Sequence, residues 1–289
     1  MVHKMAETKS DNIWERIQKI PILPLRLLFI ALIIIPLLFG ITIPMTPSTP
    51  TKQYYDFIRN MPAGSVVLFD SQMYGWNYGD CAPGCASTLN LILNSPNNLK
   101  LVIVFEGSDG PMWWATMQKD YKVTIPQNKK YGVDYVQYGW YVGDERGFAA
   151  LLDNFWGYYP KDYFGTDTST IPMMQNIHSG KDIGVVISST SLSALIDFEV
   201  RQAYGRYGIP LLSAPAGMTV MSVIPYYPYA YKGYITGLSG AAQLNSLMGI
   251  GGLTSLEGTA FSFMTLEAFI LAILGIVGGY MTTRGGKKT

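Results

Sequence analysis

Polar side chains follow several short apolar runs of the sequence, and such positions are where parallel α/β sheets bind ligands. The runs span residues 65–71, 100–105 and 183–188. The candidate ligand-binding residues at their ends are Asp70, Ser71, Glu106, Asp109, Ser189, Thr190 and Ser191. Their chemistry fits two kinds of site, which are a pair of carboxylates and a cluster of hydroxyls.

Asp70 and Glu106 form the first kind of candidate. Carboxylates at neighbouring strand ends can act as acid and base in an enzyme, or can hold a cation. For either residue alone, a hydrogen-bonded loop carboxylate is the favoured interpretation. An enzyme of this kind requires the two carboxylates to converge within one pocket.

Ser189, Thr190 and Ser191 form the second kind, because an expected helix begins at residue 191. Their hydroxyls and the free backbone N–H groups of that helix end could hold an anion. A simple N-cap explains the same residue types. Capping is the favoured interpretation of any one of them.

The common cofactor and nucleophile motifs do not occur in the sequence. The segment after residue 71 lacks G-x-G-x-x-G, and the chain has no G-x-x-x-x-G-K-[S/T] and no G-x-S-x-G. His3 and His178 are the only histidines, which disfavours a zinc site or a histidine-dependent triad. We therefore predict no cofactor and no metal. A net charge of +1 without an interior basic cluster also disfavours nucleic acid as a partner.

Cys81 and Cys85 are the only cysteines, and Pro83-Gly84 lies between them. A Pro-Gly turn could bring the two sulfurs together, so the sequence predicts a loop pinned by a disulfide in an oxidising exterior. A redox centre is disfavoured, because that motif has two intervening residues and this one has three.

Apolar runs alternate with helical patterns through the middle of the chain. The expected strands span residues 65–71, 100–105, 133–141, 183–188 and 209–214. The expected helices span residues 86–93, 111–120, 144–156, 191–207 and 232–248, and 157–182 is expected to form an irregular lobe. Unbroken Val/Ile runs separated by helices are typical of a parallel sheet covered on both faces. We predict an α/β fold over 65–248 with a Rossmann-like, doubly wound, mainly parallel sheet.

Two long apolar stretches, at 25–43 and 260–282, occupy the two ends of the chain. Charged residues make up only 14% of the sequence, against about a quarter in a typical soluble domain. A helix of about 20 apolar residues crosses a ~30 Å hydrocarbon core. We expect two transmembrane helices. The first is favoured as an uncleaved anchor, because its apolar run is long for a signal peptide and no cleavage pattern follows it.

Basic residues predict the orientation of these helices. They flank the outer ends of the two stretches, at Lys4, Lys9, Arg16, Lys19, Arg26, Arg284, Lys287 and Lys288. By the positive-inside rule, both termini are expected in the cytoplasm and residues 45–258 outside the cell membrane. The other expected segments are a cytoplasmic stretch at 1–24, a linker with a helix at 44–64, a Gly-rich linker at 249–259 and a basic tail at 283–289. The absence of an N-x-[S/T] sequence favours a prokaryotic cell.

The second apolar stretch carries small residues at helical spacing. The stripe consists of Ala268, Ala272, Gly275 and Gly279. Such a stripe permits close packing of membrane helices, either on the chain's own first helix or on another copy. We expect the bilayer as a partner, and an oligomer or other membrane subunits. Glu267 lies in the same stretch and is expected to reach the interface rather than to act within the membrane.

Several segments resemble an uncharacterised family of prokaryotic membrane-anchored proteins with an external Rossmann-like domain. The resemblance rests on residues 131–136, 164–166, 171–175, 182–187 and 237–244. It implies the same architecture and transfers no catalytic residue.

Three functions fit these observations. The favoured one is a membrane-anchored external module that binds a ligand, as a sensor or scaffold. An accessory subunit of a membrane transport or secretion complex would use the small-residue stripe. An envelope enzyme would use the carboxylates at the strand ends, and it is the least favoured.

Overall fold

One parallel β-sheet organises the computed structural model of the chain, which describes residues 13–285. Its strands are β1 Val66–Ser71, β2 Lys100–Phe105, β3 Tyr135–Trp140, β4 Val185–Ser189, β5 Leu211–Ser213 and β6 Tyr231–Tyr234. Every neighbouring pair runs parallel, in the order β3-β2-β1-β4-β5-β6. The chain order therefore reverses direction between β1 and β4, which is the place where doubly wound sheets bind ligands.

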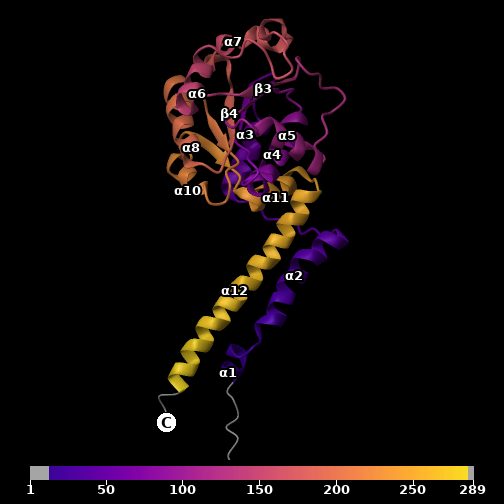
Figure 1. Cartoon of the computed structure of the whole chain (residues 1–289), viewed down its shortest axis with the longest axis vertical. Coiled ribbons are helices and arrows are strands. Elements are labelled where there is room, and N and C mark those ends of the chain that lie inside the picture. Colours follow the sequence, from indigo (N-terminus) through magenta and orange to yellow (C-terminus); the bar gives the residue numbers. More distant parts are fainter. Residues whose placement is uncertain (1–12, 286–289) are drawn as a thin grey trace, which may run out of the picture. The chain divides into compact units, whose positions relative to one another are not determined.

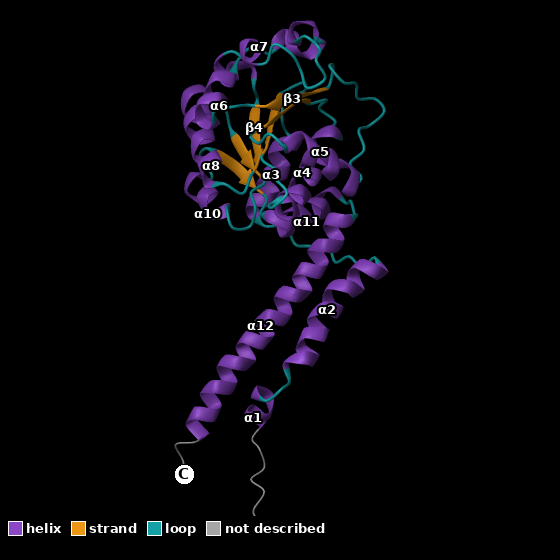
Figure 2. Ribbon diagram, viewed as in Figure 1, coloured by secondary structure: helices purple, strands orange, loops and turns teal. Residues whose placement is uncertain are grey.

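Helices cover both faces of this sheet, as Figure 2 shows. One face packs against α3 Thr49–Arg59, α4 Tyr78–Leu93, α5 Gly110–Asp120 and α11 Gly237–Met248. The other packs against α6 Asp144–Asp153, α7 Phe155–Tyr158, α8 Ser193–Glu199 and α10 Val220–Val223. The predicted α/β fold with a parallel sheet is confirmed.

Alternation along β1 decides which side chains meet which helices. Val67 and Phe69 point to the layer that contains α4, whereas Leu68 belongs to the layer that contains α8. Because side chains alternate with a period of two, Asp70 shares the face of Leu68, beneath α8. A carboxylate thus enters an otherwise apolar layer at the carboxyl end of the central strand.

Helix α8 is followed without a break by a π-helical segment, so the helical path continues beyond Glu199. Val200–Tyr204 has π-helical hydrogen bonding, and α9 Gly205–Tyr207 follows it directly. The helix predicted over 191–207 is thus present from Ser193, with a change of pitch after Glu199. Single π turns of this kind are often found at functional sites.

Two predicted elements need correction. Helix α4 begins at Tyr78, whereas the sequence analysis expected a loop up to residue 85. Pro83 lies inside this helix and cannot donate a backbone hydrogen bond there. The free energy gained by burying the residues around it offsets the cost of that missing bond. The second correction is β6, which occupies part of the helix predicted over 232–248, so that α11 begins only at Gly237.

Short 3-10 turns make up much of the lobe expected at 157–182. They are Thr168–Thr170, Pro172–Asn176 and Gly180–Asp182, and a further turn spans Ile224–Tyr226. A capping box in which Ser179 and Asp182 exchange hydrogen bonds fixes the last turn of the lobe. The lobe therefore has defined structure although it has no long element.

The chain divides into two compact units, which are 43–258 and the combination of 1–42 with 259–289. The second unit contains α1 Ile13–Gln18, α2 Ile22–Phe39 and most of α12 Leu253–Gly285 (Figure 1). Ile22–Phe39 and Leu253–Met281 are long and apolar enough to cross a membrane, which suggests a membrane protein. Helix α12 begins within the segment expected as a Gly-rich linker. Lys4, Lys9, Lys287, Lys288 and His3 lie outside the described residues.

Candidate functional site

Gln72 links the ends of the three central strands. Its amide nitrogen Nε2 donates to Glu106 Oε2 at 2.6 Å, and its Oε1 accepts a hydrogen bond from Thr190. Its backbone N–H donates to the carbonyl of Ser189 at 2.9 Å. Gln72 follows β1 directly and was not among the predicted site residues. It joins two of them, Glu106 after β2 and Thr190 after β4.

Glu106 is half-buried and accepts two hydrogen bonds on the same oxygen. Besides Gln72, the phenol of Tyr74 donates to its Oε2 at 2.7 Å. Asp70 instead accepts from Tyr141 at 2.6 Å and is fully buried. The two predicted carboxylates therefore have separate partners, and neither lines the cavity described below. Asp70 and Glu106 thus share no hydrogen-bond partner, although the charge of Glu106 reaches Asp70 and raises its pKa.

The hydroxyls of Ser189, Thr190 and Ser191 at the end of β4 are hydrogen-bonded to other groups of the protein. Thr190 Oγ1 accepts the backbone N–H of Leu192 at 2.9 Å, which closes a local turn before α8. Ser191 accepts a hydrogen bond from Asn77 at 2.7 Å, and Ser189 donates to the carbonyl of Ala214 at 3.3 Å. The N-cap of α8 is Leu192 and has no side-chain cap hydrogen bond, so none of the three residues caps this helix as expected. Their hydroxyls instead hydrogen-bond to other protein groups.

The remaining predicted residues at the strand ends have structural partners. Ser71 is fully buried and lies 4.0 Å from the sulfur of Cys85. Asp109 is the residue before α5 and accepts a hydrogen bond from the indole of Trp113 at 2.9 Å. Neither of them lies with Asp70 in a common ligand-binding arrangement.

Cys81 and Cys85 lie one turn apart in α4, and both are free, buried thiols. The predicted loop and its disulfide are therefore absent from the structure, because the segment is helical. Burial raises the pKa of the Cys85 thiol to about 12, against the lowering effect of hydrogen bonds from Ser189 and Ser71. Burial also raises the pKa of Cys81. Both groups are therefore uncharged and poorly reactive at neutral pH.

Asp70 and Glu199 form a pair of buried acids beside Ser188. Asp70 is aligned with Ser188 across the β1–β4 ladder, and Ser188 lies close enough to Glu199 to lower the pKa of that acid. Ser188 and Ser213 also share a hydrogen bond of 3.1 Å between their hydroxyls. Both acids are fully buried. A polar group thus lies at the point where the strand order reverses, on the α8 face of the sheet.

Each acid uses only one of its two carboxyl oxygens. Asp70 Oδ2 accepts from Tyr141, and Glu199 Oε2 accepts from Tyr231 at 2.7 Å. Asp70 Oδ1 and Glu199 Oε1 are buried without a hydrogen-bond partner among the described residues. A buried ionised oxygen without a partner is costly, so neutral carboxyls fit this environment better.

The electrostatics of the pair agree with this. Burial raises the pKa of Glu199 to about 8, against the lowering effect of hydrogen bonds from Tyr231 and Ser188. Burial and then the charge of Glu199 raise the pKa of Asp70 well above its usual value, and the hydrogen bond from Tyr141 acts in the opposite direction. Glu106 adds a smaller raising effect on the pKa of Asp70. Two carboxyls in one apolar site cannot both ionise readily.

Glu199 was missed by the sequence analysis, although the sequence carries a signal for it. Leu195, Glu199 and Ala203 recur at a spacing of four, and all three are buried. A helical pattern in which an acid occupies a position that faces the core predicts that the acid is buried. Tyr141 and Tyr231 had no such signal, because their partners are far away in the sequence.

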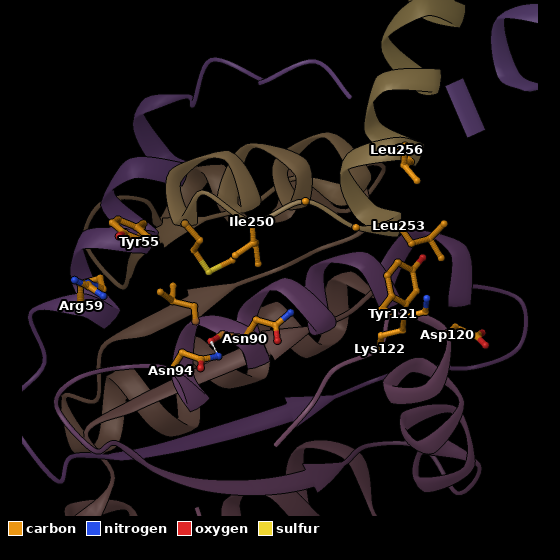
Figure 3. A pocket seen from close by; sticks show the side chains of 14 residues that line it. Tyr55, Arg59, Asn90, Asn94, Asp120, Tyr121, Lys122, Ile250, Leu253 and Leu256 are labelled. Atoms are coloured by element: carbon orange, nitrogen blue, oxygen red, sulfur yellow. Dashed lines mark hydrogen bonds between the residues drawn. The ribbon is translucent and has the colours of Figure 1, made fainter. Parts of the chain in front are cut away.

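A cavity of about 860 Å³ lies on the opposite face of the sheet, outside α4. We call it the linker cavity. Asn90 and Leu91 of α4, with the C-cap residue Asn94, form one wall, and the segment from Met248 to Leu256 forms the facing wall. Figure 3 shows Tyr55 and Arg59 of α3 at one end, with Tyr121 and Lys122 at the other. Its size is within the usual range for small-molecule sites.

The charged groups at this cavity differ in their partners. Asp120 accepts a hydrogen bond from the phenol of Tyr78 at 2.7 Å, and Glu257, next to the cavity, accepts one from Tyr121 at 3.0 Å. Arg59 and Lys122 are exposed and form no ion pair with any acid in residues 13–285. Arg59 lies over the ring of Tyr55, at 5.8 Å from its centroid. The acids at the cavity thus have donors, whereas the cations lack acceptors.

The small-residue stripe of α12 is largely uncovered. Ala268, Ala272 and Gly275 are exposed, and Gly279 is half-buried. A Cβ atom built on Gly275 would meet nothing within 4 Å. Glu267, by contrast, is 7% exposed, and its carboxylate oxygens have no hydrogen-bond partner among the described residues. Its side chain therefore lies on the buried side of α12, whereas the expectation that Glu267 reaches the membrane interface stays a prediction.

Comparison with protein-family models and with curated proteins gave no match for this chain.

Proposed function

We propose that this chain is a membrane-anchored ligand-binding module, with the linker cavity as its ligand site. The observation that carries the proposal is the identity of one cavity wall. Met248, Ile250 and Leu253 line the cavity, and the same segment leads directly into the apolar helix α12. A ligand held there contacts both the α/β unit and the start of a candidate membrane span.

This arrangement supports a sensor rather than a passive anchor. Gly249 and Gly252 have φ values of +68° and +107°, which L-amino acids with a Cβ rarely adopt. A Cβ built on Gly249, Gly251 or Gly252 would meet nothing within 4 Å, so the linker is free of close packing. Such a segment can change conformation at low cost, and ligand contacts with it would bias the direction in which α12 leaves the unit.

We further infer that the α/β unit is Rossmann-like and lies outside the cell membrane, with both chain ends in the cytoplasm. The basic residues at the outer ends of the two apolar stretches support this orientation. The arrangement also agrees with the resemblance to prokaryotic membrane-anchored proteins. Labelling of cysteines introduced at exposed Lys119 or Lys181, with a reagent that cannot cross the membrane, tests it in intact cells.

Filling the linker cavity tests the proposed function. Asn90→Trp places a large ring into the cavity from α4, and Ala115→Trp adds the same ring to an exposed position of α5 as a control. Full-length chains are purified from native membranes in mild detergent, and retained small molecules are identified by mass spectrometry. We expect a molecule that copurifies with the wild type and with Ala115→Trp, and is lost from Asn90→Trp. Equal retention by both variants would contradict the proposal.

An accessory subunit of a larger membrane complex is the second candidate, and the uncovered stripe of α12 favours it. Ala268, Ala272 and Gly275 form a surface that a membrane helix could approach closely. Gly275→Leu should release copurifying membrane proteins or the second copy of the chain. Val277→Leu, on an exposed position off the stripe, should not. Unchanged association in Gly275→Leu would remove this candidate.

A further inference from the structure

We propose that the linker cavity binds the anionic headgroup of a membrane phospholipid. This inference rests on the proposed function and specifies the ligand of that same cavity. Three properties of the described residues support this proposal. The cavity has cations without a carboxylate partner and an apolar wall, and only a few residues separate it from the expected membrane span.

The charges at the cavity favour an anion. Arg59 and Lys122 lie at its two ends and have no carboxylate partner in the part of the chain that the structure describes. Asp120 already accepts a hydrogen bond from Tyr78. An anion that enters the cavity would therefore find charge-assisted donors that no protein acid satisfies. Guanidinium groups in particular match the geometry of phosphate oxygens.

The walls favour an amphiphile over a small hydrophilic anion. Leu91, Met248 and Ile250 line the cavity between the two charged ends, and Ile250 is 37% exposed. Inorganic phosphate has no apolar group that could pack against such a surface. The glycerol and the first methylenes of a phospholipid would remove this apolar surface from water, which is favourable.

The small number of residues between the cavity and the expected membrane span favours a lipid as the source of the anion. Leu256 lines the cavity, and Ala260 begins the apolar stretch expected to cross the bilayer. Four residues extend at most about 14 Å, and a helix of that length rises only about 6 Å. The headgroup layer on each side of the hydrocarbon core is about 5–7 Å thick. The wall at Leu256 therefore lies at or near the level of the headgroups.

The aromatic residues at the two ends fit the same environment. Tyr55 stands beside Arg59, and Tyr121 stands beside Lys122. Tyrosines are enriched at both membrane–water interfaces, where their rings lie at the level of the headgroups. The linker cavity has this composition although it belongs to the α/β unit rather than to a membrane helix bundle.

The test uses the full-length chain in nanodiscs of phosphatidylcholine alone or of phosphatidylcholine mixed with phosphatidylglycerol. After transfer to mild detergent, native mass spectrometry counts the lipids that stay bound to each chain. We expect the wild type to retain phosphatidylglycerol in preference to phosphatidylcholine. The double variant Arg59→Gln/Lys122→Gln should lower this retention at least about tenfold, because it removes both cationic donors at the ends of the cavity.

A matched control removes the same charge from neighbouring positions. Lys52→Gln/Lys119→Gln changes exposed lysines of α3 and α5 that do not line the cavity, and it should retain phosphatidylglycerol like the wild type. Equal retention of both lipids by the wild type would overturn the inference. So would equal loss in the two double variants, or displacement of the lipid by inorganic phosphate.

The outcomes separate this inference from the proposed function. If Asn90→Trp loses a copurifying molecule that is not an anionic lipid, the cavity is a ligand site and only the lipid assignment falls. If Asn90→Trp retains every ligand that the wild type retains, the proposed function falls and the lipid assignment falls with it.

Discussion

The phenol of Tyr231 in β6 donates a hydrogen bond of 2.7 Å to Glu199 in α8, and both residues are fully buried. Tyr141 and Asp70 repeat this relationship at 2.6 Å. Each tyrosine thus supplies the one donor that a buried carboxyl needs at an apolar helix–sheet interface. Because the second oxygen of each carboxyl lacks a partner among the described residues, the protonation state of the pair affects the stability of the sheet.

Stability should fall as the pH rises through the neutral range. The folded pKa of Glu199, about 8, lies above its ordinary value of 4.5, so the folded chain binds more protons than the unfolded chain between these values. The contribution of Glu199 to the free energy of unfolding is therefore fully present below about pH 4.5 and is lost as the pH rises through about 8. The raised pKa of Asp70 acts with the same sign. Urea unfolding of the full-length chain in detergent, followed by tryptophan fluorescence at a series of pH values, measures the slope.

Glu199→Gln provides the control for this pH dependence. Glutamine keeps the shape and can still accept from Tyr231, but it does not titrate, so the slope should become shallower. Asp70 leaves a residual slope. Glu145, whose pKa is lowered to about 2 mainly by its hydrogen bond from Arg201, does not titrate in the neutral range. A slope as steep in Glu199→Gln as in the wild type would refute the assignment.

Removing either tyrosine hydroxyl should destabilise the chain. Tyr231→Phe removes the phenolic donor from Glu199 Oε2, and Tyr141→Phe removes it from Asp70 Oδ2. The other oxygen of each acid already lacks a partner among the described residues. An unsatisfied buried polar group costs about 1–3 kcal/mol, and we expect a loss of this size for each variant. Tyr229→Phe serves as the control, because Tyr229 is 74% exposed. Urea midpoints equal to that of Tyr229→Phe would show that these bonds contribute little.

The central sheet was predictable because its strands leave a local pattern. Val66–Ser71, Lys100–Phe105 and Val185–Ser189 are short runs dominated by aliphatic residues, and each is buried on both faces. Tyr231–Tyr234 has no such run, since its sequence is Tyr-Lys-Gly-Tyr and its hydrogen bonds come from β5. Its strand character depends on a neighbour that lies far away in the sequence.

The candidate sites were less predictable than the fold. Asp70 and Glu106 follow from strand ends, but their partners Tyr141, Gln72 and Tyr74 depend on side-chain directions after each strand. The linker cavity brings together residues of α3, α4, α5, α11 and α12 with residues of connecting segments, which no local spacing indicates. Its most distant walls meet only after the sheet has placed α4 and α11 on one face.

The two cysteines should behave as slow, free thiols. Both are buried in α4, and burial raises the pKa of Cys85 to about 12, so almost no thiolate is present at neutral pH. Without any reductant, a chromogenic thiol reagent should react slowly with the folded chain and should find both thiols after unfolding in urea. A disulfide would leave no reactive thiol until a reductant is added, and this result would overturn the assignment.

Gly233 should be among the least replaceable residues of the sheet. A Cβ at this position of β6 would lie 2.6 Å from the Cα of Tyr54 and 2.9 Å from the carbonyl oxygen of Pro50, so α3 would have to move. Real side chains do not approach backbone atoms this closely, and Gly233→Ala should cost several kcal/mol through overpacking. Gly139→Ala is a matched control in β3, because a Cβ there meets nothing within 4 Å. Thermal unfolding of the two variants tests the contact between β6 and α3. A melting temperature of Gly233→Ala equal to that of Gly139→Ala would mean that α3 does not pack on β6 at this distance.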